Sequence, residues 1–291
     1  MTASRHTPTF SIVIPTLNEE QFLPRLLNDL KNQTYKHFEV IHVDGYSEDQ
    51  TCAKAAEFKP ALQLKTIKVK KRNVSFQRNT GSDRASGQWV IFMDADNQVK
   101  KSFLAQLVRR LEEHPDTDIF SCLLDKPDTS MFMKSMVDFC NIVMLMTARV
   151  RPFAAGALIG IRKEKLHSTQ FNTDMRMSED HQFVEQAVKS GCRYRVFRNP
   201  KYMFSLRRFE KEGSLKIMVA YAQSAAVLLG GQKFERFLPE YPMVGGALYS
   251  AEERLHGFLP SMRDIIRRTT TRQQLKLQKY ILSIQQLINE L

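Results

Sequence analysis

Apolar and polar residues alternate along the first part of the chain in blocks that predict strands and helices in turn. The apolar run at Phe10–Pro15 is rich in β-branched residues, which is typical of a strand buried on both faces, and Phe38–Val43 and Trp89–Met93 predict two more strands. A shorter run at Leu62–Val69 predicts a further strand. A helical segment follows each strand, and these predicted helices end near Lys31, Phe58, Ser86 and Glu113.

This alternation, repeated four times within about 115 residues, predicts an α/β fold with an open, mostly parallel sheet and right-handed crossovers. Two capping boxes are predicted at helix starts, Asn18 with Gln21 and Ser47 with Gln50. In such sheets, ligands bind beyond the carboxyl ends of the strands. Polar clusters stand at these ends, at 16–19, 44–49 and 94–97.

The second half of the chain has a less regular pattern. It predicts strands at Ile119–Leu123, Phe153–Ile161 and Tyr194–Phe197 and helices at Met131–Ala148 and Ser178–Ser190. The helix at 131–148 is rich in methionine, which suits a packing surface or an adaptable groove for a lipid-linked acceptor. Beyond Gly213 the pattern is helical, so we expect a domain over residues 1–213 and a C-terminal helical extension over 214–291.

The sharpest candidate for chemistry is the sequence Asp94-Ala95-Asp96, which directly follows a buried strand. Carboxylates two residues apart on an extended segment project to the same side. Such hard oxygen ligands suit Mg²⁺ or Mn²⁺, which in turn bind a diphosphate. A polar turn after a strand is the alternative interpretation of the same residues.

Composition narrows the class of protein without naming its partner. Hydrophobic residues make up 43% of the chain, enough for a normal core, and the net charge of +12 favours acidic partners such as nucleotide phosphates, nucleic acid or an anionic membrane surface. The four cysteines form no CxxC pair, which argues against a zinc site or disulfide framework. No signal peptide or run of about 20 apolar residues is present, so we expect a cytoplasmic protein, with peripheral binding to the inner face of a membrane as an open alternative.

Four motifs in order, FSIVIPTLNEE, VDGYSEDQT, FMDADN and SEDHQF, resemble the large inverting glycosyltransferase family numbered two, which has the Rossmann-like GT-A fold. The resemblance covers about residues 10–213. It implies a UDP- or GDP-sugar donor, Mg²⁺ or Mn²⁺ at the Asp-x-Asp motif, a carboxylate as general base, and a sugar or lipid-linked acceptor. Nucleic acid is not an expected partner, because no recognised nucleic-acid-binding module is present.

The resemblance also assigns roles to individual residues. The donor-binding residues that it implies are Pro15, Thr16, Asn18, Glu19, Asp44, Arg78, Asp94, Ala95 and Asp96. Asp94 and Asp96 match the metal and ribose carboxylates, and we expect Asp96 to contact the metal directly. Asp44 matches the first acid of a pair near the base and ribose, but Gly45 replaces the second acid. This departure leaves the nucleobase open.

Asp180, in the Glu179-Asp180 pair, matches the general base of the family. It would take a proton from the acceptor hydroxyl as that oxygen attacks the anomeric carbon. Acidic residues behind a serine cap are also favoured by the helix dipole alone, so a purely structural role is the alternative. Arg207 and Arg208 could close on the diphosphate, or form a solvated basic turn.

Other features remain open at the level of sequence. The basic stretch at 65–72 is more simply a solvated strand face than a partner site. Apolar residues spaced by three and four at 277–291 predict a helix that docks on the same chain or forms a homo-oligomer. A nucleotidyltransferase making the activated sugar is disfavoured, because the first strand is followed by no Gly-rich phosphate loop. A non-catalytic protein that binds membrane surfaces or nucleic acid through its charge is the third alternative.

Overall fold

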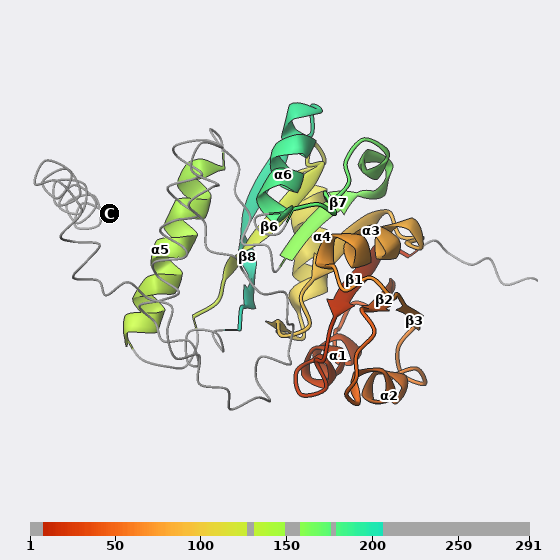
Figure 1. The fold of residues 1–291 in the computed structure, drawn as a ribbon. Helices are drawn as coiled ribbons and strands as arrows, with labels where there is room; N and C mark the ends of the chain where they lie inside the picture. Colours follow the sequence, from red (N-terminus) through yellow and green to blue (C-terminus); the bar gives the residue numbers. More distant parts are fainter. Residues whose placement is uncertain (1–7, 127–130, 149–157, 176–178, 206–291) are drawn as a thin grey trace, which may run out of the picture. The chain divides into compact units, whose positions relative to one another are not determined.

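The computed structural model describes residues 8–126, 131–148, 158–175 and 179–205, and all structural statements below concern these residues. They form an eight-stranded sheet with helices on both faces (Figure 1). The strands are β1 (Phe10–Thr16), β2 (Phe38–Asp44), β3 (Leu64–Lys68), β4 (Trp89–Met93), β5 (Gln98–Val99), β6 (Ile119–Leu124), β7 (Leu158–Arg162) and β8 (Tyr194–Met203). The helices are α1 (Leu23–Lys31), α2 (Thr51–Ala56), α3 (Val74–Asp83), α4 (Phe103–Glu113), α5 (Met131–Thr147) and α6 (Glu179–Lys189), with a short 3₁₀ helix at Lys163–His167.

The strand order is β3-β2-β1-β4-β7-β6-β8-β5. The pairs β3–β2, β2–β1, β1–β4 and β6–β8 are parallel, whereas β7 runs antiparallel to both of its neighbours and β5 runs antiparallel to β8. The predicted α/β fold with a mostly parallel sheet is therefore confirmed. The sequence pattern missed β5, because a two-residue strand carries no periodic signal.

Each face of the sheet packs against its own set of helices. Alternate residues of β1 point to opposite faces, so that Ile12 and Ile14 join one apolar cluster and Val13 joins the other. The first cluster includes the leucines of α1 and α4, and the second includes Phe183 and Val184 of α6. This burial on both faces explains why β1 and β4 are nearly uninterrupted apolar runs in the sequence.

Both predicted capping boxes are wrong. Helix α1 begins at Leu23, and Asn18 lies before it with a φ of 56°, so its side chain cannot cap that helix. Helix α2 begins at Thr51, and the Ser47 hydroxyl donates to Asp44 instead. In both loops the polar side chains bond across to other loop groups, which competes with capping. Helix α3 does have a side-chain cap, because Asn73 Oδ1 accepts from the Phe76 amide at 2.8 Å.

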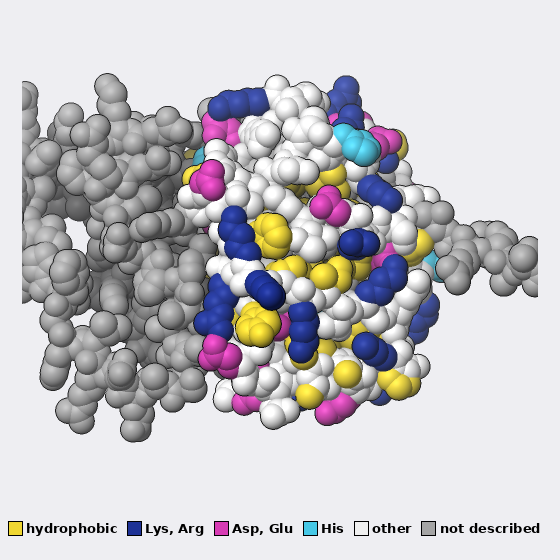
Figure 2. All heavy atoms as spheres, turned by 45° about the vertical axis from the view of Figure 1, so that its right-hand side comes forward, with side chains coloured by type: hydrophobic (Ala, Val, Ile, Leu, Met, Phe, Trp, Pro, Cys, Tyr) yellow, Lys and Arg dark blue, Asp and Glu magenta, His cyan; other side chains and the backbone are white. Residues whose placement is uncertain are grey.

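Strand β3 lies at one edge of the sheet and carries the start of the basic stretch. Lys65 and Lys68 are exposed on it, and Figure 2 shows Lys and Arg side chains spread over the face that it brings forward, with Asp and Glu side chains among them. Lys65 bonds to Glu39 at 2.9 Å, and Arg72 pairs with Glu48. This arrangement favours the interpretation of the stretch as a solvated strand edge.

The second half of the fold agrees with the sequence where it can be compared. Helix α5 docks on β6 through Asn141, whose side chain accepts from the amide of Leu124 and donates to its carbonyl. The predicted strand at 153–161 is confirmed from Leu158 onward, while residues 153–157 lie outside the described residues. The same is true of Ser178 and of the predicted extension at 214–291 with its oligomer-forming helix. The boundary at residue 213 therefore stays a prediction.

The described residues contain no helix that combines the length and hydropathy needed to cross a bilayer. All four cysteines are free: Cys122 and Cys192 are buried, and Cys52 and Cys140 are partly buried. This agrees with the expectation that the protein has no disulfide framework.

Candidate active site

The predicted polar clusters meet at one edge of the sheet. Strands β1, β2 and β4 are parallel, and Thr16 pairs in register with Asp44, so their carboxyl ends lie side by side. The Asp94–Asp96 segment follows β4 at the same edge. The tertiary structure thus brings together three segments that the sequence separates by up to about 80 positions.

Two of these segments form an interlocked pair of loops. The amide of Asn18 donates to Ser47 Oγ, and the amide of Glu48 donates back to Asn18 Oδ1, both at 2.8 Å. The amide of Glu19 donates to Thr51 Oγ1 at the same distance. These bonds satisfy backbone groups that strand ends leave unpaired. They also hold both loops in one conformation before any ligand binds.

The side chains of Thr16 and Asp44 are engaged beneath these loops. Thr16 Oγ1 lies 2.8 Å from His42 Nε2 and donates to Asp44 Oδ1 at 3.2 Å. Asp44 also accepts from the amide and hydroxyl of Ser47. Burial raises the pKa of Asp44, but these hydrogen bonds outweigh it and leave the pKa below its ordinary value. Asp44 is therefore an ionised carboxylate held in a fixed position.

The expected residues of the first strand end differ in their exposure. Pro15, Thr16 and Glu19 are buried, whereas Asn18 is partly exposed. Tyr46, which the motif comparison did not single out, has a φ of 67° and is 55% exposed beside Asp44. The contacts with the donor that the resemblance implies for Pro15, Thr16 and Glu19 stay predictions. The hydrogen bonds of the Thr16 side chain and the Glu19 amide show that these two residues also hold the loops together.

The structure supplies a physical reason for Gly45, where the family motif has a second acid. Gln77 Nε2 donates to the carbonyl of Thr16 at 2.9 Å, and the amide of Gly45 donates to the same carbonyl at 2.8 Å. A Cβ atom at residue 45 would lie 2.1 Å from Gln77 Nε2. Any side chain at this position would displace Gln77. Sequence reasoning missed Gln77, because its contact with Gly45 exists only in the folded chain.

Arg78 is the centre of the site. Its guanidinium is 3% exposed and bonds to Asp94 Oδ1 through Nη2 and to Glu179 Oε1 through Nη1, each at 3.0 Å. These contacts join α3, the segment after β4, and the start of α6. Burial would lower the pKa of Arg78, but Asp94, Glu179 and Asp180 raise it above its ordinary value. The resemblance placed Arg78 near the donor, and the structure adds that it binds both acidic motifs together.

An aromatic layer supports Arg78 from below. Its guanidinium carbon lies 5.1 Å from the centre of the Phe171 ring, and that ring stacks on Phe183 of α6 at 4.0 Å. Asn79 holds Phe171 by two backbone bonds, donating to its carbonyl at 2.8 Å and accepting from its amide at 2.9 Å. A cation over an aromatic face is stabilised by the ring quadrupole. No sequence motif marks Phe171, so the pattern alone could not have found it.

Asp180 lies beside this cluster, in the first turn of α6. Burial and the neighbouring charge of Glu179 together raise the pKa of Asp180 to about 7, although Arg78 lowers it. A carboxyl group with such a pKa can both accept and release a proton near neutral pH. The raised pKa therefore supports the assignment of Asp180 as the base, because an acidic residue that only stabilises the start of a helix does not need such a pKa.

The donor chemistry of Asp94 and Asp96 fits a divalent cation. Both residues are partly exposed at the carboxyl edge of β4, and Mg²⁺ is typically bound by one or two carboxylates together with substrate phosphates. Within the described residues, no group of three or more His, Cys, Asp or Glu side chains is arranged to hold a metal without such a substrate. The two carboxylates would thus hold a cation chiefly together with a diphosphate.

Other predicted residues are less informative. Arg207 and Arg208 lie outside the described residues, so their proposed contact with the diphosphate stays a prediction. Gly160, in the predicted strand at 153–161, has a packing role: a Cβ atom there would lie 2.1 Å from the Phe120 ring.

Solved structures share this fold. A mannosyltransferase from Pyrobaculum calidifontis, solved with GDP-mannose and Mn²⁺, aligns with a TM-score of 0.64 over 84% of this chain and 69% of its own, at 22% identity. Residues 1–349 of Staphylococcus aureus TarS, solved with UDP-GlcNAc, align with a TM-score of 0.56 over 67% of this chain and 57% of that one, at 25% identity. The GT-A arrangement expected from the resemblance is confirmed.

Sequence comparison gives the family. The family model for glycosyl transferase family 2 matches residues 11–169, more than half of the chain, and the protein therefore belongs to that family. The poly(ribitol-phosphate) beta-N-acetylglucosaminyltransferase TarS of S. aureus is 26% identical over 68% of this chain, which spans only 36% of the TarS length. The putative glycosyltransferase EpsH of Bacillus subtilis is 24% identical over 80% of this chain and 73% of its own.

Proposed function

We propose that this protein transfers a sugar from a nucleoside diphosphate sugar to an acceptor hydroxyl, with inversion at the anomeric carbon. The observation that carries this proposal is the bridge made by Arg78 between Asp94 and Glu179, each at 3.0 Å. It ties Asp94, one of the two donor-side carboxylates, to Glu179, the sequence neighbour of the candidate base Asp180. Membership of glycosyl transferase family 2 supports the same reaction class.

In the proposed reaction, the acceptor oxygen attacks the anomeric carbon and the bond from that carbon to the diphosphate breaks. Asp180 takes the acceptor proton, and the electron pair of the broken bond leaves with the nucleoside diphosphate. The pKa of Asp180, raised to about 7, makes it a stronger base than an ordinary aspartate while part of it is still ionised at neutral pH. A single base opposite the leaving group gives inversion.

Asp94 and Asp96 are the proposed ligands of Mg²⁺ or Mn²⁺, with Asp96 in direct contact. Such an ion, when bound, would offset the charge that develops on the diphosphate as it leaves. Arg78 orients Asp94 for this role through its bond at 3.0 Å. The fixed loops at 16–20 and 44–51 are proposed to hold the nucleoside, with Asp44 toward the ribose and Asn18 and Tyr46 on the exposed side.

UDP- and GDP-sugars are the proposed donors, because similar structures were solved with UDP-GlcNAc and with GDP-mannose. The acceptor is proposed to be a sugar or a lipid-linked or polymeric precursor. The net charge of +12 supports contact with an acidic acceptor or with an anionic membrane surface.

The donor site is tested by thermal unfolding with UDP, GDP and other nucleoside diphosphates, with and without Mn²⁺. A ligand that binds only the folded state raises the melting temperature. We expect a metal-dependent rise with one nucleotide, lost in Asp96→Asn and kept in Asp83→Asn, a control at an exposed carboxylate on α3. The absence of any nucleotide-dependent shift would contradict the proposed donor site.

The role of Asp180 is tested separately by the release of nucleoside diphosphate from the donor identified above. We expect Asp180→Asn to lower the rate constant by about 10²- to 10⁴-fold, the usual contribution of a general base, while the thermal shift with nucleotide persists. Full activity in Asp180→Asn would rule out this residue as the base. Release of pyrophosphate from a nucleoside triphosphate and a sugar phosphate would instead favour the nucleotidyltransferase alternative.

A further inference from the structure

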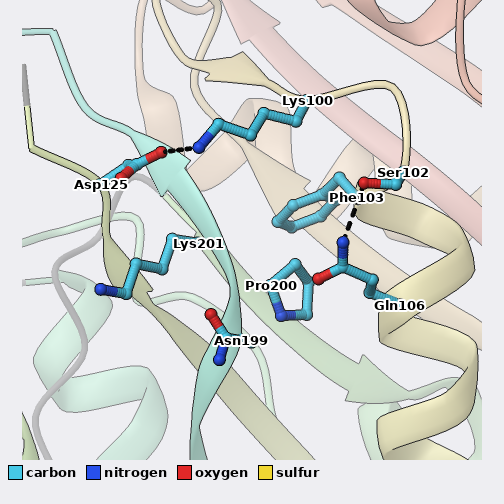
Figure 3. Close-up of a pocket in the computed structure, with 8 residues that line it drawn as sticks. All are labelled: Lys100, Ser102, Phe103, Gln106, Asp125, Asn199, Pro200 and Lys201. Atoms are coloured by element: carbon cyan, nitrogen blue, oxygen red, sulfur yellow. Dashed lines mark hydrogen bonds and ion pairs between the residues drawn. The ribbon is translucent and has the colours of Figure 1, made fainter.

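A polar hollow of about 180 Å³ lies between the start of α4 and the end of β8, outside the site described above (Figure 3). It is lined by eight residues: Lys100, Ser102, Phe103, Gln106, Asp125, Asn199, Pro200 and Lys201. Six of these carry a side-chain group that can donate or accept a hydrogen bond, so the hollow is built for a polar ligand.

Two lysines of this hollow come from segments that are neighbours in the sheet: Lys100 directly follows β5, and Lys201 lies in β8. Strands β5 and β8 are antiparallel, with Gln98 opposite Met203 and Val99 opposite Tyr202. Continued by one residue past the end of β5, this register brings Lys100 opposite Lys201. Directly opposed side chains lie on the same face of the sheet, and like charges at such positions destabilise the pairing. A bound anion would remove this repulsion.

Only one of the two lysine ammonium groups forms an ion pair with a carboxylate of the described residues. Lys100 Nζ bonds to Asp125 Oδ2 at 2.7 Å, while no carboxylate of the described residues lies within ion-pair distance of Lys201. Figure 3 shows the Lys100 and Lys201 side chains extending in the same direction, with the Asp125 carboxylate next to Lys100. The lining therefore keeps one excess positive charge.

The hollow lies close to the proposed metal carboxylates. Strand β7 is antiparallel to both β4 and β6, and β6 is parallel to β8, so β4, β6 and β8 run in the same direction. Asp125 after β6 and Lys201 near the end of β8 therefore lie toward the same edge of the sheet as Asp94 after β4. Lys100 follows Asp96 by four residues, so their Cα atoms are at most about 14 Å apart. A group bound at the lysines could thus belong to the same molecule whose hydroxyl reaches the anomeric carbon.

We propose that Lys100 and Lys201 bind a phosphate group of the acceptor, which makes the acceptor a phosphate-bearing molecule. This inference rests on the proposed glycosyltransferase function. An ammonium group binds phosphate as a point charge, and two such groups from neighbouring strands can share its oxygens. Asn199 and Ser102 also line the hollow with neutral polar side chains, and Ser102 Oγ accepts from Gln106 Nε2 at 2.8 Å.

The probe for this site is glycerol 3-phosphate, with glycerol as the uncharged control. Binding would be followed by NMR of the backbone amides at 100–106, 125, 199 and 201, in the presence of Mg²⁺ and a saturating nucleoside diphosphate so that the donor site is occupied. We expect saturable shifts with glycerol 3-phosphate and none with glycerol. Lys201→Gln should weaken the affinity about fivefold to tenfold, as expected for one charge-assisted hydrogen bond.

Lys101→Gln is the matched control, because Lys101 is an exposed neighbour that does not line the hollow. It should change the affinity less than about twofold, a change of well under 1 kcal/mol, and Lys201→Arg should restore most of the loss. Equal weakening in Lys101→Gln and Lys201→Gln would overturn the proposal, since it would indicate diffuse attraction. The absence of saturable shifts would overturn it as well.

A second arm distinguishes the source of the phosphate. Vesicles of phosphatidylglycerol, compared with phosphatidylcholine, should bind in a Lys201-dependent manner if the phosphate belongs to a lipid-linked acceptor. Vesicle binding that Lys201→Gln and Lys101→Gln weaken equally would count against the site. Thermal shifts with nucleotide are measured on the same samples: if they persist while phosphate binding fails, only this inference is wrong, and the proposed transferase function stands.

Discussion

Arg78 Nη1 donates to Glu179 Oε1 at 3.0 Å and so joins α3 to the start of α6 across 101 positions of sequence. The same guanidinium bonds to Asp94 at 3.0 Å. The two acidic motifs that the sequence singles out are therefore held together by one buried cation. Both the stability of the fold and the geometry of the site depend on it.

Replacing Arg78 should destabilise the folded protein. Arg78→Met leaves Asp94 and Glu179 without their partner, and the loss of one partner of a buried ion pair costs about 3 kcal/mol or more of unfolding free energy. Urea unfolding would measure this loss. Arg84→Met, at an exposed arginine just beyond the same helix, should stay within about 0.5 kcal/mol of the parent protein. Equal stability of the two variants would contradict the central role of Arg78.

Gly45→Ala should destabilise the loop between β2 and α2. The added Cβ atom would lie 2.1 Å from Gln77 Nε2 and would force that side chain away from the carbonyl of Thr16. The loss of this buried hydrogen bond should lower the unfolding free energy by about 1 to 2 kcal/mol. In a Gln77→Ala background, the same substitution should cost clearly less. Additive losses in this double-mutant cycle would show that the two residues do not compete for space.

Glu39 should make the stability of the protein depend on pH. Burial alone would raise the pKa of Glu39, but hydrogen bonds from Ser86, Lys65 and Ser11 lower it from 4.5 to about 2. The unfolded chain therefore binds this proton at a higher pH than the folded protein. The stabilisation, about 3 kcal/mol, is complete above pH 4.5 and is lost as the pH falls toward 2.

Urea unfolding between pH 6 and pH 2 would check this expectation, with the variants Glu39→Gln and Glu57→Gln side by side. Glu39→Gln should be less stable at pH 6 and should lose less stability on acidification, because it has no proton to take up. Glu57 is exposed, so Glu57→Gln should follow the parent protein. Identical pH profiles for Glu39→Gln and the parent would show that Glu39 is not the responsible group.

Tyr46 should lower the stability of the folded protein through its backbone conformation while it contributes to nucleotide binding through its side chain. Its φ of 67° lies in the left-handed region, which costs a residue with a Cβ atom about 1 to 2 kcal/mol and costs glycine nothing. Tyr46→Gly should therefore raise the melting temperature or leave it unchanged, although it removes a large side chain. If the exposed ring contacts the nucleoside, the same variant should weaken nucleotide binding. A clear loss of stability in Tyr46→Gly would refute the argument from strain.

The local elements could be predicted because their signals are local. The buried strands are continuous apolar runs, and Leu23, Leu26, Leu27 and Leu30 of α1 recur at helical spacing and are all fully buried. The strand-end acids Asp44 and Asp94 were identified from their place after these runs. The helix starts were predicted less well, because Asn18 and Ser47 have the residue types of caps but find partners in the opposite loop.

The sequence by itself determined the order of strands and helices, the edge of the sheet where the polar motifs gather, and the family to which they belong. Only the tertiary structure decided that Arg78 binds Asp94 and Glu179 together, that Gln77 excludes a side chain at residue 45, and that Lys100 and Lys201 line one hollow. The physical reason is that periodicity reflects the burial of neighbouring residues along one element. Contacts between distant residues depend on strand order and register, which no local pattern encodes.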